Sequence, residues 1–373
     1  MLLPPPNAIR FAVIVPVYNT AIYLRECLDS VLSQTYENFI VFVVNDGSTD
    51  DSSNILDQYR TKDSRLRIIH KTNKGVSSAR NTALDLIEKD PKIDFIICLD
   101  SDDYWAPQCL ETVVKHLNGC KDRMLIFGVQ NFDKNGRVVE KIKKAHPPMV
   151  FTGEDSFSFA FDNFNLKYKT SPAFAYFLGN TVIPCKCVRG LRFNTTLQLG
   201  EDQEYKMRAI SKCSGLIVIS DLLIWYRLRN GSLSHSHIAN RFNCQMFMCL
   251  IKTATALSPN LLKIIERKAA NSWWDTLRET AKLRKLDDYW NEFLQALNIM
   301  ELTFKTDILK TPKFRNRVRI FKLGKIATWL YFSIKISKST PTKMNDYFNL
   351  AKQFLYFLIA KIRLYKEHIS PHS

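Results

Sequence analysis

Over its first hundred residues, the chain alternates between short apolar runs and longer segments whose apolar residues recur at helical spacing. The apolar runs are typical of buried strands and cover residues 11–17, 39–44, 66–70 and 95–99. Amphipathic helices are expected between them, at residues 21–33, 50–59 and 76–87. This alternation predicts a mainly parallel sheet with helices on both faces, in which ligands bind beyond the carboxyl ends of the strands.

The alternation loosens beyond about residue 120. A strand is expected at 125–129, and the sequence DKNGRVV, which begins at Asp133, predicts a hairpin turn. An aromatic-rich and irregular stretch covers 151–195. The later pattern predicts a helix at 201–210, strands at 216–219 and 222–227, and helices between about 238 and 300.

The formal net charge of +17 is unevenly placed along the 373 residues. Residues 303–373 contain 15 Lys and Arg against 3 Asp and Glu, so this tail carries +12 of the total. Apolar residues recur there at helical spacing over 313–335 and 347–365, with basic residues beside them. Basic amphipathic helices favour an anionic membrane surface, which predicts peripheral membrane binding. Alternatively, the apolar stripes pack on the catalytic body and the charges face solvent.

Cysteine placement and the N-terminus argue against several protein classes. The nine cysteines form no C-x-x-C pair, and Cys185 and Cys187 lack the partners of a zinc site. Free thiols in a reducing compartment are therefore expected. The sequence has neither the features of a signal peptide nor a run of about 18 uncharged apolar residues. We expect a cytoplasmic chain without a membrane span.

Three carboxylates crowd the sequence IICLDSDDYW directly after the apolar run at 95–99. Asp100, Asp102 and Asp103 would repel one another unless a cation lay among them. Mg²⁺ or Mn²⁺ binds carboxylate oxygens together with phosphate oxygens, so we expect a metal here. Alternation along extended backbone would place Asp100 and Asp102 on one side and Asp103 on the other. The alternative is an acidic turn in which Asp103 caps the helix near Pro107.

Four further polar stretches lie at expected strand ends or helix starts. VPVYN ends the first strand, and VVNDGSTD ends the second, where Gly47 permits a tight turn into a helix whose amides favour anions. In NKGVSSARN, Arg80 could pair with a phosphate or stack on a base, or it could be an ordinary exposed helix residue. In LGEDQEY, Glu201 and Asp202 could simply complement a helix dipole.

Taken in order, VPVYN, VNDGSTD, NKGVSSARN, LDSDDYW and LGEDQEY resemble the family 2 glycosyltransferases, which have the GT-A fold. The resemblance is strong over about the first 120 residues and thins over 121–195. It returns at Glu201–Asp202 and in WYRLRNGSLSHS, and it ends by about residue 240. It implies an α/β protein with a Rossmann-like, mixed but mainly parallel sheet, helices on both faces and a C-terminal helical region.

The resemblance also implies a role for particular residues. The implied nucleotide-binding residues are Pro16, Tyr18, Asn19, Asp46, Arg80 and Asp100. Asp102 and Asp103 match the motif that holds Mn²⁺ or Mg²⁺ on the donor diphosphate, and Asp202 matches the catalytic base. Asn45 stands where many members have a second Asp, which leaves Asp46 as the better contact for the nucleobase. Arg227, Arg229, His235 and His237 would belong to a loop that closes over the diphosphate, although either His could equally lie in an exposed loop.

The implied activity is an inverting, metal-dependent transfer of a sugar from a nucleotide-sugar, most simply a UDP-sugar, to a glycan hydroxyl. The acceptor would be a lipid-linked bacterial surface polysaccharide or lipooligosaccharide, reached from the inner face of the cytoplasmic membrane. The alternatives are a sugar-phosphate nucleotidyltransferase, whose Gly-rich loop after the first strand is missing here, and a basic nucleic-acid-binding protein, for which no signature is present.

The resemblance and the charge pattern together predict three regions. Residues 1–237 would form the catalytic domain, with a nucleotide-binding half at 9–120 and an acceptor half at 121–237. Residues 238–302 would form a helical extension, and 303–373 the basic amphipathic tail.

Overall fold

The computed structural model divides the chain into two compact units, residues 1–265 and 266–373. The structure describes residues 8–133, 136–140, 147–161, 178–197, 200–228, 249–282, 291, 294–298, 300–301, 311–322 and 328. Arg229, His235, His237 and the amphipathic stretch 347–365 lie outside the described residues. The expected division into three regions stays a prediction.

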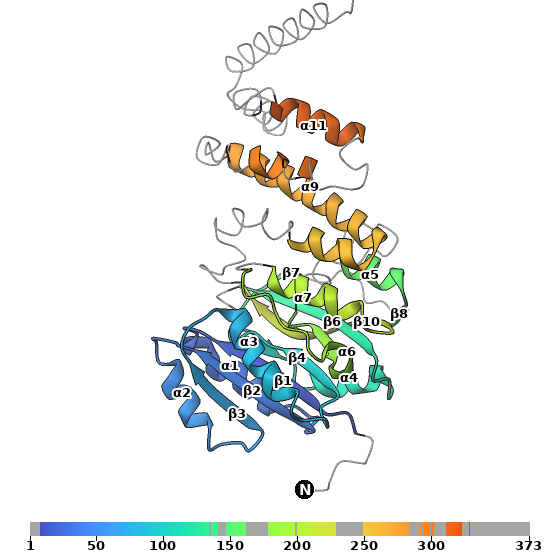
Figure 1. Ribbon diagram of the computed structural model, residues 1–373. Helices are drawn as coiled ribbons and strands as arrows, with labels where there is room; N and C mark the ends of the chain where they lie inside the picture. The colour runs from blue at the N-terminus through green and yellow to red at the C-terminus, as the bar shows by residue number, and fades with distance from the viewer. Residues whose placement is uncertain are drawn as a thin grey trace, which may run out of the picture. The chain divides into compact units, whose positions relative to one another are not determined.

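Ten strands in the described part of the first unit form one mixed sheet (Figure 1). They are β1 (Phe11–Val17), β2 (Phe39–Asp46), β3 (Leu66–Lys71), β4 (Phe95–Cys98), β5 (Tyr104–Trp105), β6 (Arg123–Phe132), β7 (Val138–Glu140), β8 (Met149–Phe151), β9 (Thr181–Pro184) and β10 (Gly215–Arg227). The order is β3-β2-β1-β4-β9-β6-β10-β5, with β7 beside β6 and β8 beside β10. The first four strands are parallel, β9 is antiparallel to both neighbours, and β6 and β10 are parallel to each other. The sheet is therefore mixed and mainly parallel, as the sequence predicted.

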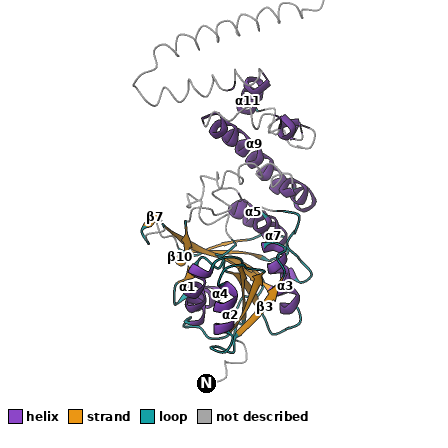
Figure 2. Ribbon diagram, turned by 90° about the vertical axis from the view of Figure 1, so that its left-hand side faces the viewer, coloured by secondary structure: helices purple, strands orange, loops and turns teal. Residues whose placement is uncertain are grey.

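Helices cover both faces of this sheet (Figure 2). The helices described in the first unit include α1 (Ala21–Leu32), α2 (Ser52–Tyr59), α3 (Val76–Ile87), α4 (Cys109–Leu117), α5 (Glu154–Phe161), α6 (Cys185–Val188) and α7 (Glu201–Ile210). Leu28 of α1, Leu56 of α2 and Leu110 of α4 join Val13 and Val15 of β1 in one buried cluster. In contrast, α3 packs on β1 and β2 from the opposite face. The strand runs of the first hundred residues are apolar because both of their faces are buried.

The elements predicted beyond about residue 120 were confirmed only in part. The hairpin after Asp133 is confirmed, because β7 pairs antiparallel with β6. The helix at 201–210 is also confirmed as α7. The two strands expected at 216–219 and 222–227 are one strand, β10, whose pairing with β6 shifts register between Val218 and Leu222. The stretch 151–195 is less irregular than expected, because it contains α5, β9 and α6.

Pro16 is placed where its missing N–H costs no bond of the sheet. The carbonyl of Ile14 accepts a hydrogen bond from Leu99 N at 2.9 Å, so this side of β1 faces β4. Pro16, two residues later, faces the same side, and β4 ends at Cys98. The strand can therefore continue to its end with proline in it.

The second unit contains most of α9 (Pro259–Lys282), together with α11 (Pro312–Lys322). Phe314 and Phe321 of α11 are buried, and their ring centroids lie 6.1 and 5.0 Å from that of Trp273. Arg317 donates a hydrogen bond to Asn271 Oδ1 at 2.9 Å. In this part of the basic tail, two aromatic side chains thus pack on α9 within the second unit. Membrane binding by the tail, and its packing on the catalytic body as the alternative, both stay predictions.

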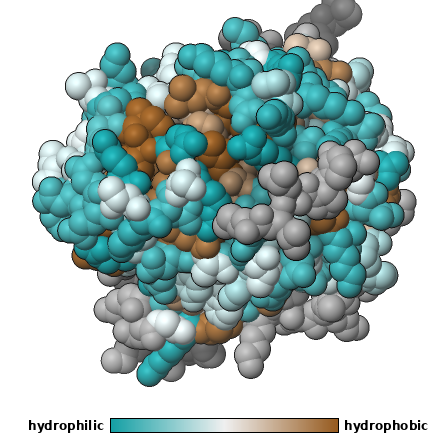
Figure 3. Space-filling model, turned by 90° about the horizontal axis from the view of Figure 1, so that it is seen from below, coloured by the Kyte–Doolittle hydropathy of each residue, from teal (hydrophilic) through white to brown (hydrophobic). Residues whose placement is uncertain are grey.

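The surface seen from below Figure 1 is mainly hydrophilic and carries a compact apolar patch among polar residues (Figure 3). Apolar surface of this kind is common in folded proteins. Among the described residues, no helix combines the length and apolarity needed to cross a membrane.

Candidate active site

The residues singled out in the sequence lie together because three parallel strands end at one edge of the sheet. The register pairs Val17 of β1 with Asn45 of β2 and Ile14 of β1 with Cys98 of β4. The segments that follow these strands therefore leave the sheet side by side. They carry most of the predicted nucleotide-binding and metal-binding residues.

The loops after β1 and β2 are tied together by Asn19. Its Oδ1 accepts a hydrogen bond from Thr49 N at 2.8 Å, and its own N–H donates to Ser48 Oγ at 3.1 Å. Asn19 has a positive φ of 52°, a conformation that asparagine tolerates better than most residues. Asp50 accepts a hydrogen bond from Ala21 N at 2.9 Å, at the start of α1. Tyr18 is left 50% exposed at this edge.

Asp46, at the end of β2, holds the loop that leads into α3. Its carboxylate is only 2% exposed and accepts hydrogen bonds from Gly75 N at 2.7 Å, from Lys74 N at 3.1 Å and from Lys71 Nζ. Gly47 follows with a φ of +71°, and a Cβ added there would lie 2.7 Å from Asn73 N. The turn after β2 therefore requires glycine on both conformational and steric grounds.

Arg80 joins two acidic residues that are 101 positions apart in the sequence. Its guanidinium is buried and donates to Asp100 Oδ1 at 2.9 Å and to Glu201 Oε1 at 2.8 Å. Burial opposes the charged form, but Asp100 and Glu201 outweigh it and raise the pKa of Arg80 above its usual value. The interpretation of Arg80 as an ordinary exposed helix residue is therefore wrong. The sequence analysis assigned Glu201 no role in the site. Its position directly before Asp202 was the signal that could have identified it.

The three acidic residues after β4 have different environments. Asp100 is paired with Arg80, and Asp102 is half-buried. Asp103 is only 2% exposed, and its Oδ1 accepts a hydrogen bond from Arg227 N at 2.9 Å. Burial, followed by the charges of Asp102 and Asp100, raises the pKa of Asp103 well above its usual value. Asp103 does not cap the next helix, because it leads into β5 and α4 begins only at Cys109.

Arg227, at the end of β10, fixes the acidic segment from the other side. Its Nε donates to the carbonyl of Asp102 at 2.9 Å, and its guanidinium also pairs with Glu26 of α1. The guanidinium carbon lies 4.7 Å from the ring centroid of Tyr23 and 4.5 Å from that of Phe132. Arg227 therefore connects α1, β6 and β10 to the backbone of the acidic segment.

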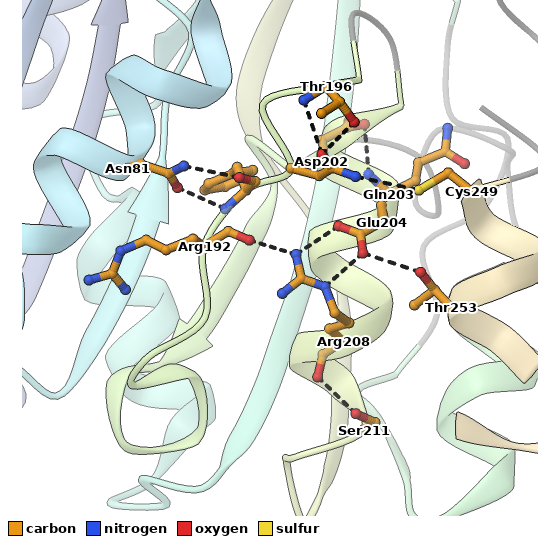
Figure 4. Close-up of polar contacts among 12 residues, drawn as sticks. Asn81, Arg192, Thr196, Asp202, Gln203, Glu204, Arg208, Ser211, Cys249 and Thr253 are labelled. Carbon is orange, nitrogen blue, oxygen red and sulfur yellow. Dashed lines mark hydrogen bonds and ion pairs between the residues drawn. The ribbon is translucent and has the colours of Figure 1, made fainter. Parts of the chain in front are cut away.

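Asp202 is the second residue of α7 (Figure 4). It directly follows Glu201, which pairs with Arg80. Its Oδ1 accepts a hydrogen bond from Gln203 N at 2.7 Å, and its side chain is half-buried, whereas Glu201 is buried. Burial and the charge of Glu201 raise the pKa of Asp202 to about 7. Asp202 is thus a carboxylate that can exchange a proton near neutral pH.

The acidic segment has the donor chemistry of a magnesium or manganese site. Among the described residues, no three His, Cys, Asp or Glu side chains form a group that could hold an ion alone. Mg²⁺ is commonly held by one or two carboxylates together with substrate phosphates, so a full set of protein ligands is not required. One Oδ atom of Asp103 is buried without a hydrogen-bond partner in the described structure, which leaves this carboxylate incompletely satisfied. The segment fits such an ion, and the assignment of Asp102 and Asp103 as its ligands stays a prediction.

Comparison with known proteins supports the pattern seen in the sequence. Residues 12–194 match the family model Glycosyl transferase family 2. The chain is similar to Glycosyltransferase GlyA of Streptococcus pneumoniae, with 31% identity over 231 residues, which are 60% of this chain and 31% of that protein. It is also similar to Glycosyltransferase GlyG of the same organism, with 35% identity over 125 residues, which are 33% of this chain and 40% of that protein. The chain thus matches less than half of the length of these two curated relatives.

The fold is also similar to that of solved structures. Residues 1–349 of TarS from S. aureus, in complex with UDP-GlcNAc, align with a TM-score of 0.53 and 21% identity, covering 80% of this chain and 92% of that chain. A second structure of the same TarS residues aligns with a TM-score of 0.52 and 20% identity, covering 85% of this chain and 92% of that chain. At this level of identity, the similarity establishes the fold.

Proposed function

Residues 12–194 match glycosyl transferase family 2, and from this match we propose that the chain is a member of the family and transfers a sugar, with inversion, from a UDP-sugar to a glycan hydroxyl. The observation that carries the proposal is the buried Arg80, which links Asp100 to Glu201 beside Asp202. The fold shared with TarS, whose structures include complexes with UDP-GlcNAc and UDP, supports the choice of donor. The comparisons do not favour a nucleotidyltransferase or a nucleic-acid-binding protein.

The nucleotide would bind across the ends of β1, β2 and β4. Tyr18 is exposed at this edge, while Pro16 and Asn19 shape the backbone beside it. Three donors make four contacts with the Asp46 carboxylate, because Lys74 N is shared between its two oxygens at 3.1 and 3.2 Å. A contact with an N–H of the base would therefore replace part of this shared bond. Arg80 would contribute to the same pocket by holding Asp100 in place.

The metal ion would be held by Asp102 and Asp103. When bound, Mg²⁺ or Mn²⁺ neutralises negative charge on the leaving nucleoside diphosphate. Arg227 would orient the ligands, because it donates to the Asp102 carbonyl and its backbone N–H binds Asp103. Of the two carboxylates, Asp102 is the more accessible.

Asp202 would act as the general base. It would take the proton from the acceptor hydroxyl while that oxygen attacks the anomeric carbon on the face opposite the leaving group. A pKa near 7 matches this task, because the carboxylate is then ionised in a large fraction of molecules and still accepts a proton readily. Glu201 would keep its ion pair with Arg80 during this step.

The acceptor would be a lipid-linked surface glycan, such as a polysaccharide or lipooligosaccharide precursor. The basic tail supports this choice, since +12 of the net charge lies in residues 303–373. Such a charge would hold the enzyme at the inner face of the cytoplasmic membrane, where lipid-linked acceptors are present.

The test is a panel of UDP- and GDP-sugars, assayed for hydrolysis and transfer with and without Mn²⁺ or Mg²⁺. We expect the wild-type enzyme to consume one donor in a metal-dependent reaction. Asp202→Asn should lose transfer by about 100-fold or more, the scale of lost general-base catalysis, while it still binds UDP.

Glu111→Gln is the matched control, because Glu111 is an exposed carboxylate of α4 that accepts a hydrogen bond from Thr35 Oγ1. Its activity should equal that of the wild-type enzyme. If no nucleotide-sugar binds in the presence of metal, the proposed function is wrong.

A further inference from the structure

Residues 190–194 form a short irregular segment, which we call the 190–194 strap. One set of its hydrogen bonds is made with α3 and with Glu88, directly after it. Phe193 is bound through both of its backbone groups by one side chain: Phe193 N donates to Asn81 Oδ1 at 2.7 Å, and Asn81 Nδ2 donates to the Phe193 carbonyl at 3.0 Å. Gly190 N donates to Glu88 Oε1 at 2.6 Å, and Arg192 pairs with Glu88 at 2.8 Å. The strap is thus tied along the length of α3.

The same strap is held by α7 on its other side (Figure 4). The carbonyl of Arg192 accepts a hydrogen bond from Arg208 at 2.6 Å, and Arg208 makes two bonds of 2.7 Å to Glu204. The ring of Phe193 stacks on Tyr205, with centroids 3.9 Å apart and planes 11° apart. The strap therefore connects the helix of Arg80 to the helix of Asp202.

Phe193 brings the strap into contact with the ion pair of the site. The guanidinium carbon of Arg80 is 5.4 Å from the Phe193 ring centroid, and Phe193 is buried. Arg80 Nε has no hydrogen-bond partner within the described structure, so the ring supplies part of the surroundings of this buried cation. The two Nη atoms of the guanidinium donate to Glu201 and Asp100.

We propose that Asn81 and Phe193 are positioning residues, which set the position of Asp202 by fixing α7 and Arg80 relative to the acidic segment. Asn81 holds the backbone of Phe193, Phe193 supports Arg80, and Arg80 binds the residue directly before Asp202. Displacement of a catalytic group by about 1 Å can reduce a rate by about 100-fold. This inference rests on the proposed function, because it assigns Asn81 and Phe193 to the geometry of the same reaction.

The test compares Asn81→Ala and Phe193→Leu with the wild-type enzyme in steady-state transfer assays. We expect kcat to fall by roughly 10- to 100-fold in each variant. The donor KM should change by less than about threefold, because neither side chain contacts the residues assigned to the nucleotide other than Arg80. In an Asp202→Asn background, Asn81→Ala should cause no further loss, since residues that act through one group are not additive.

Asn38→Ala is the matched control. Asn38 Nδ2 also donates a hydrogen bond to a backbone carbonyl, that of Ile9, at 3.1 Å, but Asn38 lies directly before β2 and not beside the strap. It should lower the melting temperature about as much as Asn81→Ala and leave kcat unchanged. The inference is wrong if both Asn variants lose kcat equally, if the donor KM rises as much as kcat falls, or if the Asn81 and Asp202 effects add. It is also wrong if Asn81→Ala and Phe193→Leu retain the wild-type kcat. The proposed function fails separately, if the wild-type enzyme itself transfers no sugar.

Discussion

At the residue scale, burial separates carboxylates that look alike in the sequence. Asp100, Asp102 and Asp103 are three acids within four positions, yet Asp100 is bound by Arg80 and Asp103 by the backbone of β10. Asp100 and Asp102 are both half-buried, and the backbone carbonyl of Asp102 accepts a hydrogen bond from Arg227. The two predicted metal ligands should therefore respond differently to the same substitution.

Asp102→Asn should abolish the stimulation of transfer by metal, with a loss of about 100-fold, because it removes a charged ligand. Asp103→Asn should keep activity within about fivefold of wild type, because the amide oxygen can still accept the hydrogen bond from Arg227 N. The measurement is the initial rate as a function of Mn²⁺ concentration for both variants. An equal loss of metal affinity in the two variants would contradict this distinction and assign Asp103 an equal role.

The raised pKa of Asp202 also predicts a dependence of stability on pH. A carboxyl group whose pKa is raised on folding, here to about 7 from 3.8, binds more protons in the folded than in the unfolded state between these values. Its ionisation therefore destabilises the fold as pH rises from about 4 to about 7. Asp202→Asn removes this effect, so its melting temperature should exceed that of wild type by roughly 2 °C or more at pH 8 and match it at pH 4.

Thermal unfolding at both pH values checks this prediction, with Glu111→Gln as the exposed control. A stabilisation that is the same at pH 4 and pH 8 would show that the charge of Asp202 is not its cause.

In the same pH range, kcat/KM of the wild-type enzyme should rise with pH and level off above about 7, because the base must be ionised.

At the scale of elements, the sequence predicted the first half of the sheet well and the contacts between elements poorly. The runs that became β1 to β4 are buried on both faces, so their apolar pattern is strong. The break at Ser220–Asp221 suggested two strands, but a bulge keeps β10 continuous by packing these two carbonyls against Gly128, where a Cβ would lie 2.9 Å from Asp221 O. The contact of Arg80 with Glu201 spans 121 residues and depends on folding, so spacing alone could not reveal it.

Gly47→Ala should damage the turn that carries Asp46. An alanine there would adopt a φ of +71° and place its Cβ 2.7 Å from Asn73 N, in the loop that Asp46 holds. Gly119→Ala is the control, because its φ of +78° is similar but no atom lies within 4 Å of the added Cβ. Both variants should lose roughly 1–2 kcal/mol of stability for the left-handed conformation.

Only Gly47→Ala should lose more stability than that and bind UDP more weakly. Chemical unfolding and calorimetric titration with UDP measure the two effects. Equal losses of stability in the two variants, with unchanged UDP affinity, would argue against a role of this turn in nucleotide binding.

At the scale of the whole molecule, charge and fold are distributed differently. The motifs proposed to be catalytic lie in the first compact unit, whereas residues 303–373 of the second carry +12 of the net charge. In the described α11, Phe314 and Phe321 are buried against Trp273, so these side chains already have a partner within the protein. Membrane attachment through this region would then depend on its basic residues more than on the aromatic residues of α11.

The full-length chain should therefore bind anionic vesicles and not neutral ones. Each Lys or Arg near an anionic surface contributes about 1 kcal/mol, so reversing three of them should weaken binding by about 100-fold or more. The variant is Lys352→Glu, Lys361→Glu and Arg363→Glu, and its matched control reverses three exposed lysines of the first unit, Lys62, Lys89 and Lys92. Co-sedimentation with phosphatidylglycerol and phosphatidylcholine vesicles should give strong binding of the wild type only to the former, weakened by salt through screening. Equal binding to both lipids would show that anionic charge does not drive the attachment. Equal loss in both triple variants would show that the attachment depends on general surface charge and not on the tail. In either case, the tail would be a packed part of the second unit.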